Sequence, residues 1–278
     1  MRFGSKFFKK CGEASEWAAA VINDGYTAAY CPLEVNADLK TIQSYEKAAG
    51  EHNLIIAEVG AWSNPLSPDK KTADDALEKC KKALALADEI GARCCVNIAG
   101  SRGKKWDGPS PLDLTPETFE QIIIMVRGII DSVKPKRTFY TLETMPWMYP
   151  DSAESYMELL RAIDRKQFAV HFDPVNLINC PSRYFNTGAV IKNFVKLLGK
   201  HIKSSHAKDI ILRENLTTHL DETRPGLGNL DYQIYLRELN ALPDKDLCVM
   251  LEHLNTEEEY NEAAKHIKSV AAAGGIIL

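Results

Sequence analysis

Short apolar stretches alternate with amphipathic helical patterns along the whole chain, and this alternation constrains the fold more than any other feature. We expect eight strands, at residues 1–5, 26–31, 54–62, 93–100, 138–145, 168–175, 202–209 and 247–254. Each is followed by a segment with the 3.6-residue apolar period of a helix. Repeated strand–helix units imply parallel strands joined by right-handed crossovers.

Eight such units suit a single closed (β/α)8 barrel, the TIM barrel, occupying residues 1–278. No change of composition marks a linker between two domains. An open, doubly wound sheet is the main alternative, but it normally carries a glycine-rich turn after its first strand. The chain has no GxGxxG motif at that point. We therefore predict the α/β class and the closed barrel.

Charge and composition exclude several kinds of partner. The net charge of −4 gives no general attraction to nucleic acid or to an anionic membrane, so we expect neither as a partner. No stretch approaches the ~20 apolar residues of a membrane span, and the N-terminal stretch lacks the apolar core of a signal peptide. The seven cysteines form no CxxC pair, which suggests free thiols in a reducing compartment. We expect a cytoplasmic protein.

Polar residues end four consecutive predicted strands. Glu143 ends the fifth strand, Asp173 the sixth, His206 the seventh and Glu252 the eighth. The strand phase places them on the inner face, and a barrel collects the carboxyl ends of its strands at one mouth. Three carboxylates and one imidazole at one place repel each other unless a cation neutralises them. We therefore predict that these four residues hold one divalent metal ion.

The ligand types indicate which metal to expect. Oxygen ligands with a single imidazole favour Mn²⁺, with Mg²⁺, Co²⁺ and Zn²⁺ as alternatives. Taken singly, an aspartate at a strand end is equally well explained as a loop hydrogen-bonder, and a buried histidine as a core residue. The prediction depends on the coincidence of four such residues on successive strands.

At these residues the chain resembles the xylose isomerase-like superfamily of barrels, and more closely its sugar phosphate isomerase/epimerase branch. The resemblance is carried by TLETM around Glu143, HFDPVN around Asp173, SSHAKD around His206, VMLEHL around Glu252, and RPGLGNLDY at residues 224–232. It implies the same four metal ligands and a small carbohydrate substrate. It also implies that Glu143 and Glu252 are the catalytic acid and base beside a carbonyl. Relatives form dimers and tetramers, so a homo-oligomer is an open alternative.

Two positions depart from the ketose 3-epimerases of this branch. Asn176 stands where those enzymes have a histidine that contacts a substrate oxygen, and Tyr149 stands where they have a glutamate. Three functions therefore stay open. The first is an isomerase or epimerase of a small keto-sugar or sugar acid, which we favour. The others are a metal-dependent lyase or dehydratase that expels a β-leaving group, and a sugar-binding barrel without turnover.

Further substrate-binding candidates lie near the same strand ends. His171 is expected below Asp173, where it either orients a metal ligand, touches substrate or is a core histidine. Trp62 offers an apolar face to a sugar, or packs on a loop. The other candidates are Asn176, Glu58, Asn97, Arg224 and Lys208, the last of which could hold an anion. The basic loop at residues 100–108 has no P-loop motif, and we interpret it as solvated, with anion binding as the alternative.

Overall fold

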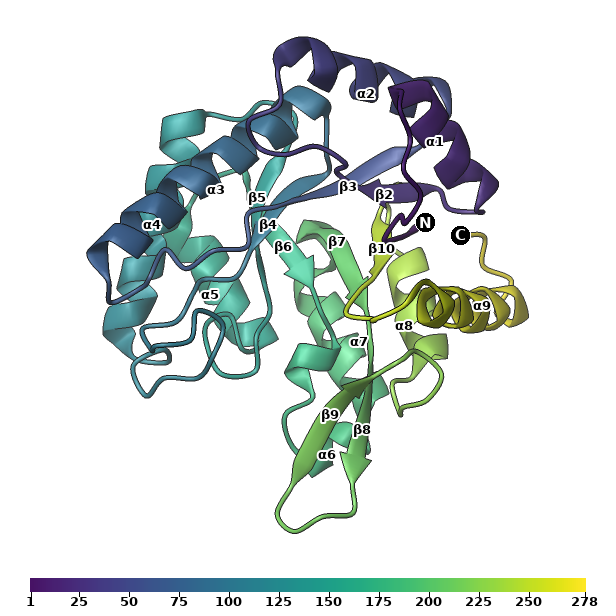
Figure 1. Cartoon of the computed structure of the whole chain (residues 1–278). Helices are drawn as coiled ribbons and strands as arrows, with labels where there is room; N and C mark the ends of the chain where they lie inside the picture. Colours follow the sequence, from purple (N-terminus) through teal and green to yellow (C-terminus); the bar gives the residue numbers. More distant parts are fainter.

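The computed structural model describes residues 1–278, which form a closed barrel of eight parallel strands (Figure 1). In spatial order the strands are β1 (Arg2–Ser5), β10 (Cys248–Leu251), β7 (Ile202–Ala207), β6 (Phe168–Phe172), β5 (Phe139–Glu143), β4 (Cys94–Asn97), β3 (Ile55–Gly60) and β2 (Ala28–Tyr30). Each lies within one of the eight predicted strands, so the predicted (β/α)8 barrel is confirmed.

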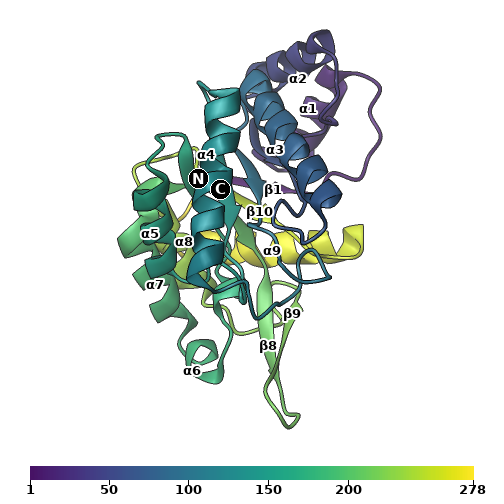
Figure 2. The ribbon, with the colours of Figure 1, turned by 90° about the vertical axis from the view of Figure 1, so that its left-hand side faces the viewer.

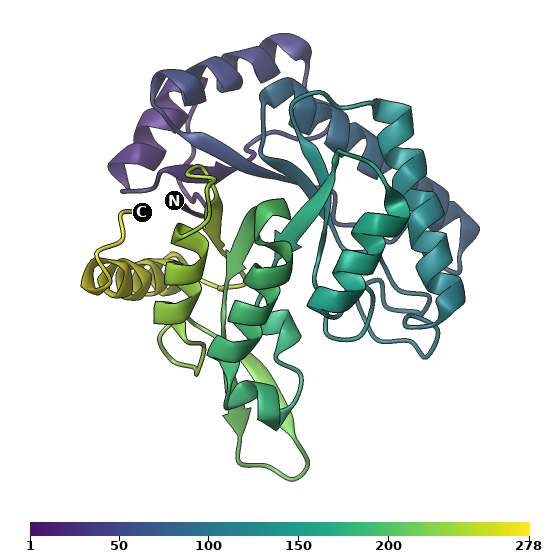
Figure 3. The ribbon, with the colours of Figure 1, turned by 180° about the vertical axis from the view of Figure 1, so that it is seen from behind.

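Helices surround the barrel and pack against their neighbours in chain order (Figure 1, Figure 3). The eight long helices are α1 (Ala14–Asn23), α2 (Leu39–Glu51), α3 (Lys70–Ile90), α4 (Pro116–Val133), α5 (Ala153–Ile163), α7 (Thr187–Leu198), α8 (Tyr232–Asn240) and α9 (Glu257–Ala273). The short elements are η1 (Val175–Leu177), α6 (Pro181–Tyr184) and η2 (Gly199–His201). None of the helices has both the length and the apolar character that crossing a membrane requires.

Side chains alternate along each strand between the barrel interior and the helix layer. Tyr140 and Leu142 of β5 belong to the large apolar core under the helices. Phe172 of β6 lies in the same core and stacks on Phe194 of α7, with ring centroids 4.1 Å apart. A small separate apolar cluster, which includes Met250, fills the barrel itself. The outward residues therefore hold the helices, and the inward residues above this cluster are free to carry polar groups.

A β-hairpin that the sequence analysis did not predict follows β7. Its strands, β8 (Asp209–Arg213) and β9 (His219–Thr223), form a two-stranded antiparallel sheet of their own. The hairpin projects beyond the barrel (Figure 2). The seventh barrel strand was expected to continue to residue 209, but it ends at Ala207, and Lys208 lies between it and the hairpin.

The Asp209 carboxylate organises the loop that follows the hairpin. It accepts hydrogen bonds of 2.9–3.1 Å from the backbone N–H groups of Ile210, Gly226, Gly228 and Leu230. A Cβ at Gly228 would collide with this carboxylate and with the carbonyl oxygen of Ile210, so only glycine fits there. The RPGLG segment is thereby closed against the base of the hairpin.

Candidate metal centre

Four strand ends bring Glu143, Asp173, His206 and Glu252 together, with one ligand atom from each within 4.8 Å of the others. His206 Nδ1 lies 2.9 Å from Glu143 Oε1 and 2.8 Å from Glu252 Oε2. It lies 4.0 Å from Asp173 Oδ2. Glu143, Asp173 and His206 are buried, and the side chain of Glu252 is 15% exposed. We call these four residues the upper cluster.

The residues of the upper cluster do not share one level of the strand pairing. Glu143 pairs with His171 rather than with Asp173, and His206 pairs with Met250. Asp173 and Glu252 each directly follow the last residue of their strands. Strands in such barrels tilt by about 36° from the barrel axis, so residues from different pairing levels meet at one height. The four side chains therefore lie at the same height along the barrel axis, although their residues are not directly paired between strands.

Lys208 places its ammonium among the same carboxylates. Nζ lies 2.8 Å from Asp173 Oδ2, 2.9 Å from Glu252 Oε2 and 3.6 Å from Glu143 Oε1, and the residue is only 2% exposed. Burial would lower the pKa of Lys208, but Asp173 and Glu252 outweigh it and raise that pKa well above its usual value. Lys208 is therefore a counter-ion of the cluster, and its predicted role of holding a substrate anion would require it to leave these carboxylates.

The upper cluster offers carboxylate oxygens that a cation would fit. Asp173 Oδ2 and Glu252 Oε2 are buried, and both lie within 2.9 Å of a charged side chain, Lys208 for each and also His206 for Glu252. Ionised carboxylates are buried only where positive charge compensates them. Carboxylate oxygens with one imidazole nitrogen form a donor set for Mn²⁺, Mg²⁺ or Co²⁺. The residues present therefore fit a divalent metal ion.

Burial and neighbouring charges set the protonation of the upper cluster. Burial raises the pKa of Asp173 to about 7, because Lys208 opposes it only in part while Glu143 adds to the rise. Burial would also raise the pKa of Glu143, but Lys208 and His206 lower it to about 2. Burial would lower the pKa of His206, yet Glu252 and Glu58 raise it well above its usual value. Asp173 and His206 must therefore lose protons before they can bind a cation.

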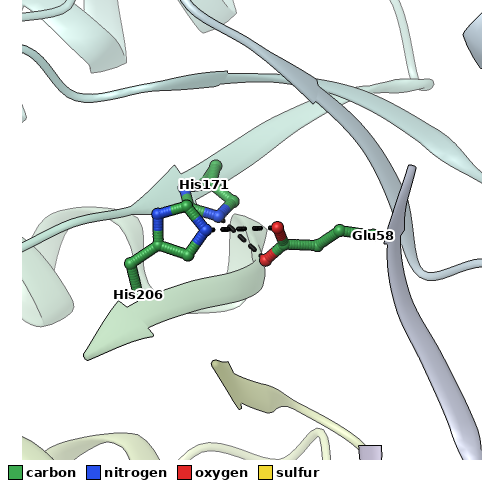
Figure 4. Close-up of side chains that lie close together, drawn as sticks. All are labelled: Glu58, His171 and His206. Atoms are coloured by element: carbon green, nitrogen blue, oxygen red, sulfur yellow. Dashed lines mark hydrogen bonds and ion pairs between the residues drawn. The ribbon is translucent and has the colours of Figure 1, made fainter. Parts of the chain in front are cut away.

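Below the upper cluster, the Glu58 carboxylate faces two neighbouring imidazoles, those of His171 and His206 (Figure 4). Its Oε1 is 3.0 Å from His171 Nε2, and its Oε2 is 3.2 Å from His206 Nε2. The Ser204 hydroxyl also donates to Oε1. Burial would raise the pKa of Glu58, but the two histidines lower it below its usual range, so Glu58 is ionised. Glu58, His171 and His206 could themselves ligate a metal, but their hydrogen bonds already satisfy the facing atoms.

A cavity of about 310 Å³ opens above the upper cluster. Its buried end is formed by Glu143, Glu252, Lys208 and Asn176, and its walls include Trp62, Ile98, Trp106, Met145 and Trp147. Asn176 Nδ2 donates to Thr144 O at 3.0 Å and lies 3.4 Å from Glu143 Oε1. The cavity therefore gives a small molecule access to the candidate metal ligands.

Four predicted substrate contacts do not line this cavity. Glu58 and His171 lie below it and are almost completely buried. Asn97 faces the helix layer, where Nδ2 lies 3.3 Å from Cys80 Sγ and Oδ1 accepts from Ser63 N. Arg224 donates to the neighbouring Pro225 carbonyl. Glu58, His171, Asn97 and Arg224 are therefore not in a position to contact a molecule in this cavity, whereas Trp62, Asn176 and Lys208 line it.

The residues of the cavity wall that the sequence analysis missed include Trp106, Trp147, Glu222 and His253. Trp106 belongs to the loop interpreted as solvated, and Glu222 comes from the unpredicted hairpin. His253 has a left-handed backbone, with φ of 57°, and its Nδ1 lies 2.9 Å from Glu222 Oε2. The signal for the tryptophans and for His253 was their place just beyond strand ends. Glu222 had no comparable signal.

The closed parallel barrel and the cluster of metal-ligating groups at its mouth define a (β/α)8-barrel protein with a candidate divalent-metal centre. The chain belongs to the xylose isomerase-like TIM barrel family, which it matches over residues 21–270. No curated protein matches the chain in sequence.

Solved structures share the fold at low sequence identity. A D-tagatose 3-epimerase-like protein has a TM-score of 0.71 at 16% identity, covering 99% of this chain and 98% of its own. The probable 3-DHS dehydratase AsbF from Bacillus anthracis has a TM-score of 0.70 at 16% identity, covering 98% and 99%. A xylose isomerase-like TIM barrel protein from Mycobacterium smegmatis in complex with magnesium has a TM-score of 0.65 at 15% identity, covering 94% and 90%. These similarities establish the fold alone.

Proposed function

We propose that the protein is a divalent-metal-dependent isomerase or epimerase that acts on a small keto-sugar, sugar acid or sugar derivative. The reaction is proton transfer next to a carbonyl. One observation carries the proposal: Glu143, Asp173, His206 and Glu252 converge at the buried end of a cavity, with one ligand atom from each within 4.8 Å of the others. Membership of the xylose isomerase-like family and the fold shared with a 3-epimerase-like protein support this reaction class.

In this proposal the four residues of the upper cluster hold one metal ion, with Mn²⁺ preferred. A bound divalent cation would polarise the substrate carbonyl and acidify the adjacent C–H group. Glu143 and Glu252 act as base and acid: one removes the proton, and the other returns a proton to the other face or to the neighbouring carbon. The lowered pKa of Glu143 keeps it ionised as a base. Asn176 positions Glu143 through its side-chain amide.

A metal-dependent lyase or dehydratase is the second candidate. The fold shared with the probable dehydratase AsbF supports it. It would begin with the same proton abstraction but would expel a β-leaving group. The two candidates therefore differ in the fate of the substrate and not in the residues that start the reaction.

Deuterium exchange distinguishes these reactions. The Mn²⁺-loaded protein is incubated in D₂O with a panel of keto-sugars and sugar acids, and products are followed by NMR and mass spectrometry. An isomerase or epimerase exchanges a carbon-bound hydrogen without loss of water, whereas a lyase releases water or an aglycone.

Glu252→Gln should lower turnover by about 10²–10⁴-fold, and the exposed Glu258→Gln should not lower it. Normal turnover in Glu252→Gln would refute the catalytic assignment; no reaction with any substrate would favour a sugar-binding barrel.

We expect a small carbohydrate as the binding partner of the protein, and neither nucleic acid nor a membrane. The proposal also places the protein in the cytoplasm, because all seven cysteines are free, which suits a reducing compartment. We also expect the protein to form a homodimer or homotetramer. Light scattering of the purified protein tests it.

A further inference from the structure

Three of the four tryptophans of the chain line the cavity above the upper cluster. The ring of Trp62 lies 6.3 Å from the ring of His206, centroid to centroid, so Trp62 is at the metal end. Trp106 and Trp147 are 40% and 37% exposed, so they are at the solvent end. The fourth, Trp17, is buried in the main core. The cavity thus has aromatic surface at both of its ends.

The two outer tryptophans are held by hydrogen bonds of their loops. Trp147 Nε1 donates to Asp107 O at 3.0 Å, which joins the loop after β5 to the loop after β4. The loop that carries Trp106 begins at Ser101, whose hydroxyl donates to Asp113 Oδ2 at 2.8 Å, and both residues are fully buried. Ser101 N in turn donates to Trp106 O. The rim of the cavity, formed by Trp106 and Trp147, is therefore fixed in place by hydrogen bonds between and within its two loops.

Each cationic side chain of the cavity already has an acidic partner. Lys105 Nζ lies 3.1 Å from Asp107 Oδ1. Lys208 is surrounded by the carboxylates of the upper cluster, and His253 pairs with Glu222. A phosphate or carboxylate on the substrate would have to break one of these pairs and lie beside the released carboxylate. Within the proposed function, the lining therefore favours neutral keto-sugars and sugar derivatives over sugar acids.

We propose that Trp106 and Trp147 form an outer subsite for the second ring of a neutral glycoside, whose reacting sugar lies against Trp62 and the upper cluster. The placement of the reacting sugar rests on the proposed function; the outer subsite rests on the rim alone. Ligand cavities are lined by apolar and aromatic side chains with a few polar groups that fix orientation. A single ring at the polar end would leave both outer indoles exposed, whereas a second ring with an apolar face covers them. That ring is a sugar or an aryl group.

Binding measurements on the Mn²⁺-loaded protein test the subsite. The probes are D-glucose and D-fructose as single rings, cellobiose as two sugar rings, phenyl β-D-glucoside as a sugar with an aryl group, and glucose 6-phosphate as the anion. Affinities are measured by calorimetry and by quenching of tryptophan fluorescence. We expect a two-ring probe to bind about tenfold or more tightly than the single rings, consistent with the size of one aromatic contact. The phosphate should bring no gain. A preference for cellobiose or for the phenyl glucoside identifies the second ring.

Four variants locate the effect. Trp106→Ala and Trp147→Ala should remove most of the two-ring preference and leave single-ring affinity within about twofold. Trp147→Phe keeps an aromatic face and should retain most of the preference. Trp17→Phe, at a residue that does not line the cavity, should leave the affinities obtained from fluorescence quenching unchanged. Thermal melting of each variant verifies that it folds.

The results separate this inference from the proposed function. Equal affinity for one-ring and two-ring probes, a preference that survives both alanine variants, or tighter binding of glucose 6-phosphate would overturn the outer subsite. Deuterium exchange into a free ketose would in that case still uphold the proposed function. A tryptophan-dependent preference for two-ring probes without any exchange or elimination would support the subsite and count against the enzyme.

Discussion

Glu58 Oε2 lies 3.2 Å from His206 Nε2 and thereby leaves the opposite ring nitrogen, Nδ1, directed at Glu143 and Glu252. A carboxylate on the far nitrogen of a metal-binding histidine fixes its tautomer and raises its basicity. Glu58 is thus a positioning residue of the candidate metal centre, although it does not line the cavity.

Glu58→Gln should weaken Mn²⁺ binding by about 10- to 100-fold, because the amide removes the negative charge that supports His206. Titration calorimetry on metal-free protein measures the affinity. Glu258→Gln, which removes the same charge from an exposed position, is the matched control. An unchanged affinity in a folded Glu58→Gln protein would contradict the positioning role.

Asp173→Asn should change how stability depends on pH in the metal-free protein. The folded-state pKa of Asp173 is about 7, above the unfolded value of about 3.9. The native state therefore holds the proton more tightly, and this contribution to stability is present below about pH 4 and is lost as the pH rises through 7. The asparagine keeps an acceptor for Val175 N but carries no charge.

Urea unfolding of both proteins in EDTA at pH 5 and pH 8 measures this effect. The stability of the wild type, relative to Asp173→Asn, should fall by on the order of 2 kcal/mol between these pH values. Contributions from other groups cancel in the comparison. The variant should also bind Mn²⁺ weakly. The same pH response in both proteins would show that Asp173 does not titrate in this range.

Lys208→Met should destabilise the metal-free protein by about 3–5 kcal/mol, because it leaves buried carboxylates without their counter-ion. Added Mn²⁺ should restore much of this loss, so the metal-induced rise in Tm should be larger in the variant than in the wild type. Lys196→Met, at an exposed helix position, serves as the control. An equal rise in Tm for both proteins would mean that Lys208 does not neutralise the upper cluster.

Phe172→Ala should cost about 3–5 kcal/mol of unfolding free energy, because the ring is fully buried and stacks on Phe194. The metal stoichiometry should not change, since Phe172 points away from the barrel interior. Phe185→Ala, at a residue 68% exposed, should shift stability by less than about 0.5 kcal/mol. Loss of metal by a folded Phe172→Ala protein would show that the two faces of β6 are not independent.

The barrel could be predicted because its strands and helices carry strong apolar periods, and the upper cluster because its members end successive strands. Asn97 was misplaced for a physical reason. In the sequence CCVN, Cys94 and Cys95 are equally apolar, so the pattern does not reveal which phase faces inward. In the structure Asn97 faces Cys80 of α3.

The hairpin and its contribution to the cavity could not be predicted in the same way. The segment between residues 209 and 223 contains only short runs of apolar residues interrupted by polar and charged ones, and no glycine marks its turn. Its strands pair only with each other and bury little of the apolar surface that makes barrel strands recognisable. Glu222 and its contact with His253 depend on this pairing, so they were inaccessible from the sequence.

The hairpin leaves and rejoins the barrel at neighbouring points, because Asp209 pairs with Thr223. It shares no strand pairing with the barrel, yet it supplies Glu222 to the cavity wall. A segment closed on itself in this way can be lengthened or randomised between residues 211 and 221 without disturbing the eight-stranded scaffold, provided that Ile210 in the core and Glu222 beside Lys208 are kept. Directed evolution confined to this insertion would therefore retune substrate choice while the reacting groups keep their geometry.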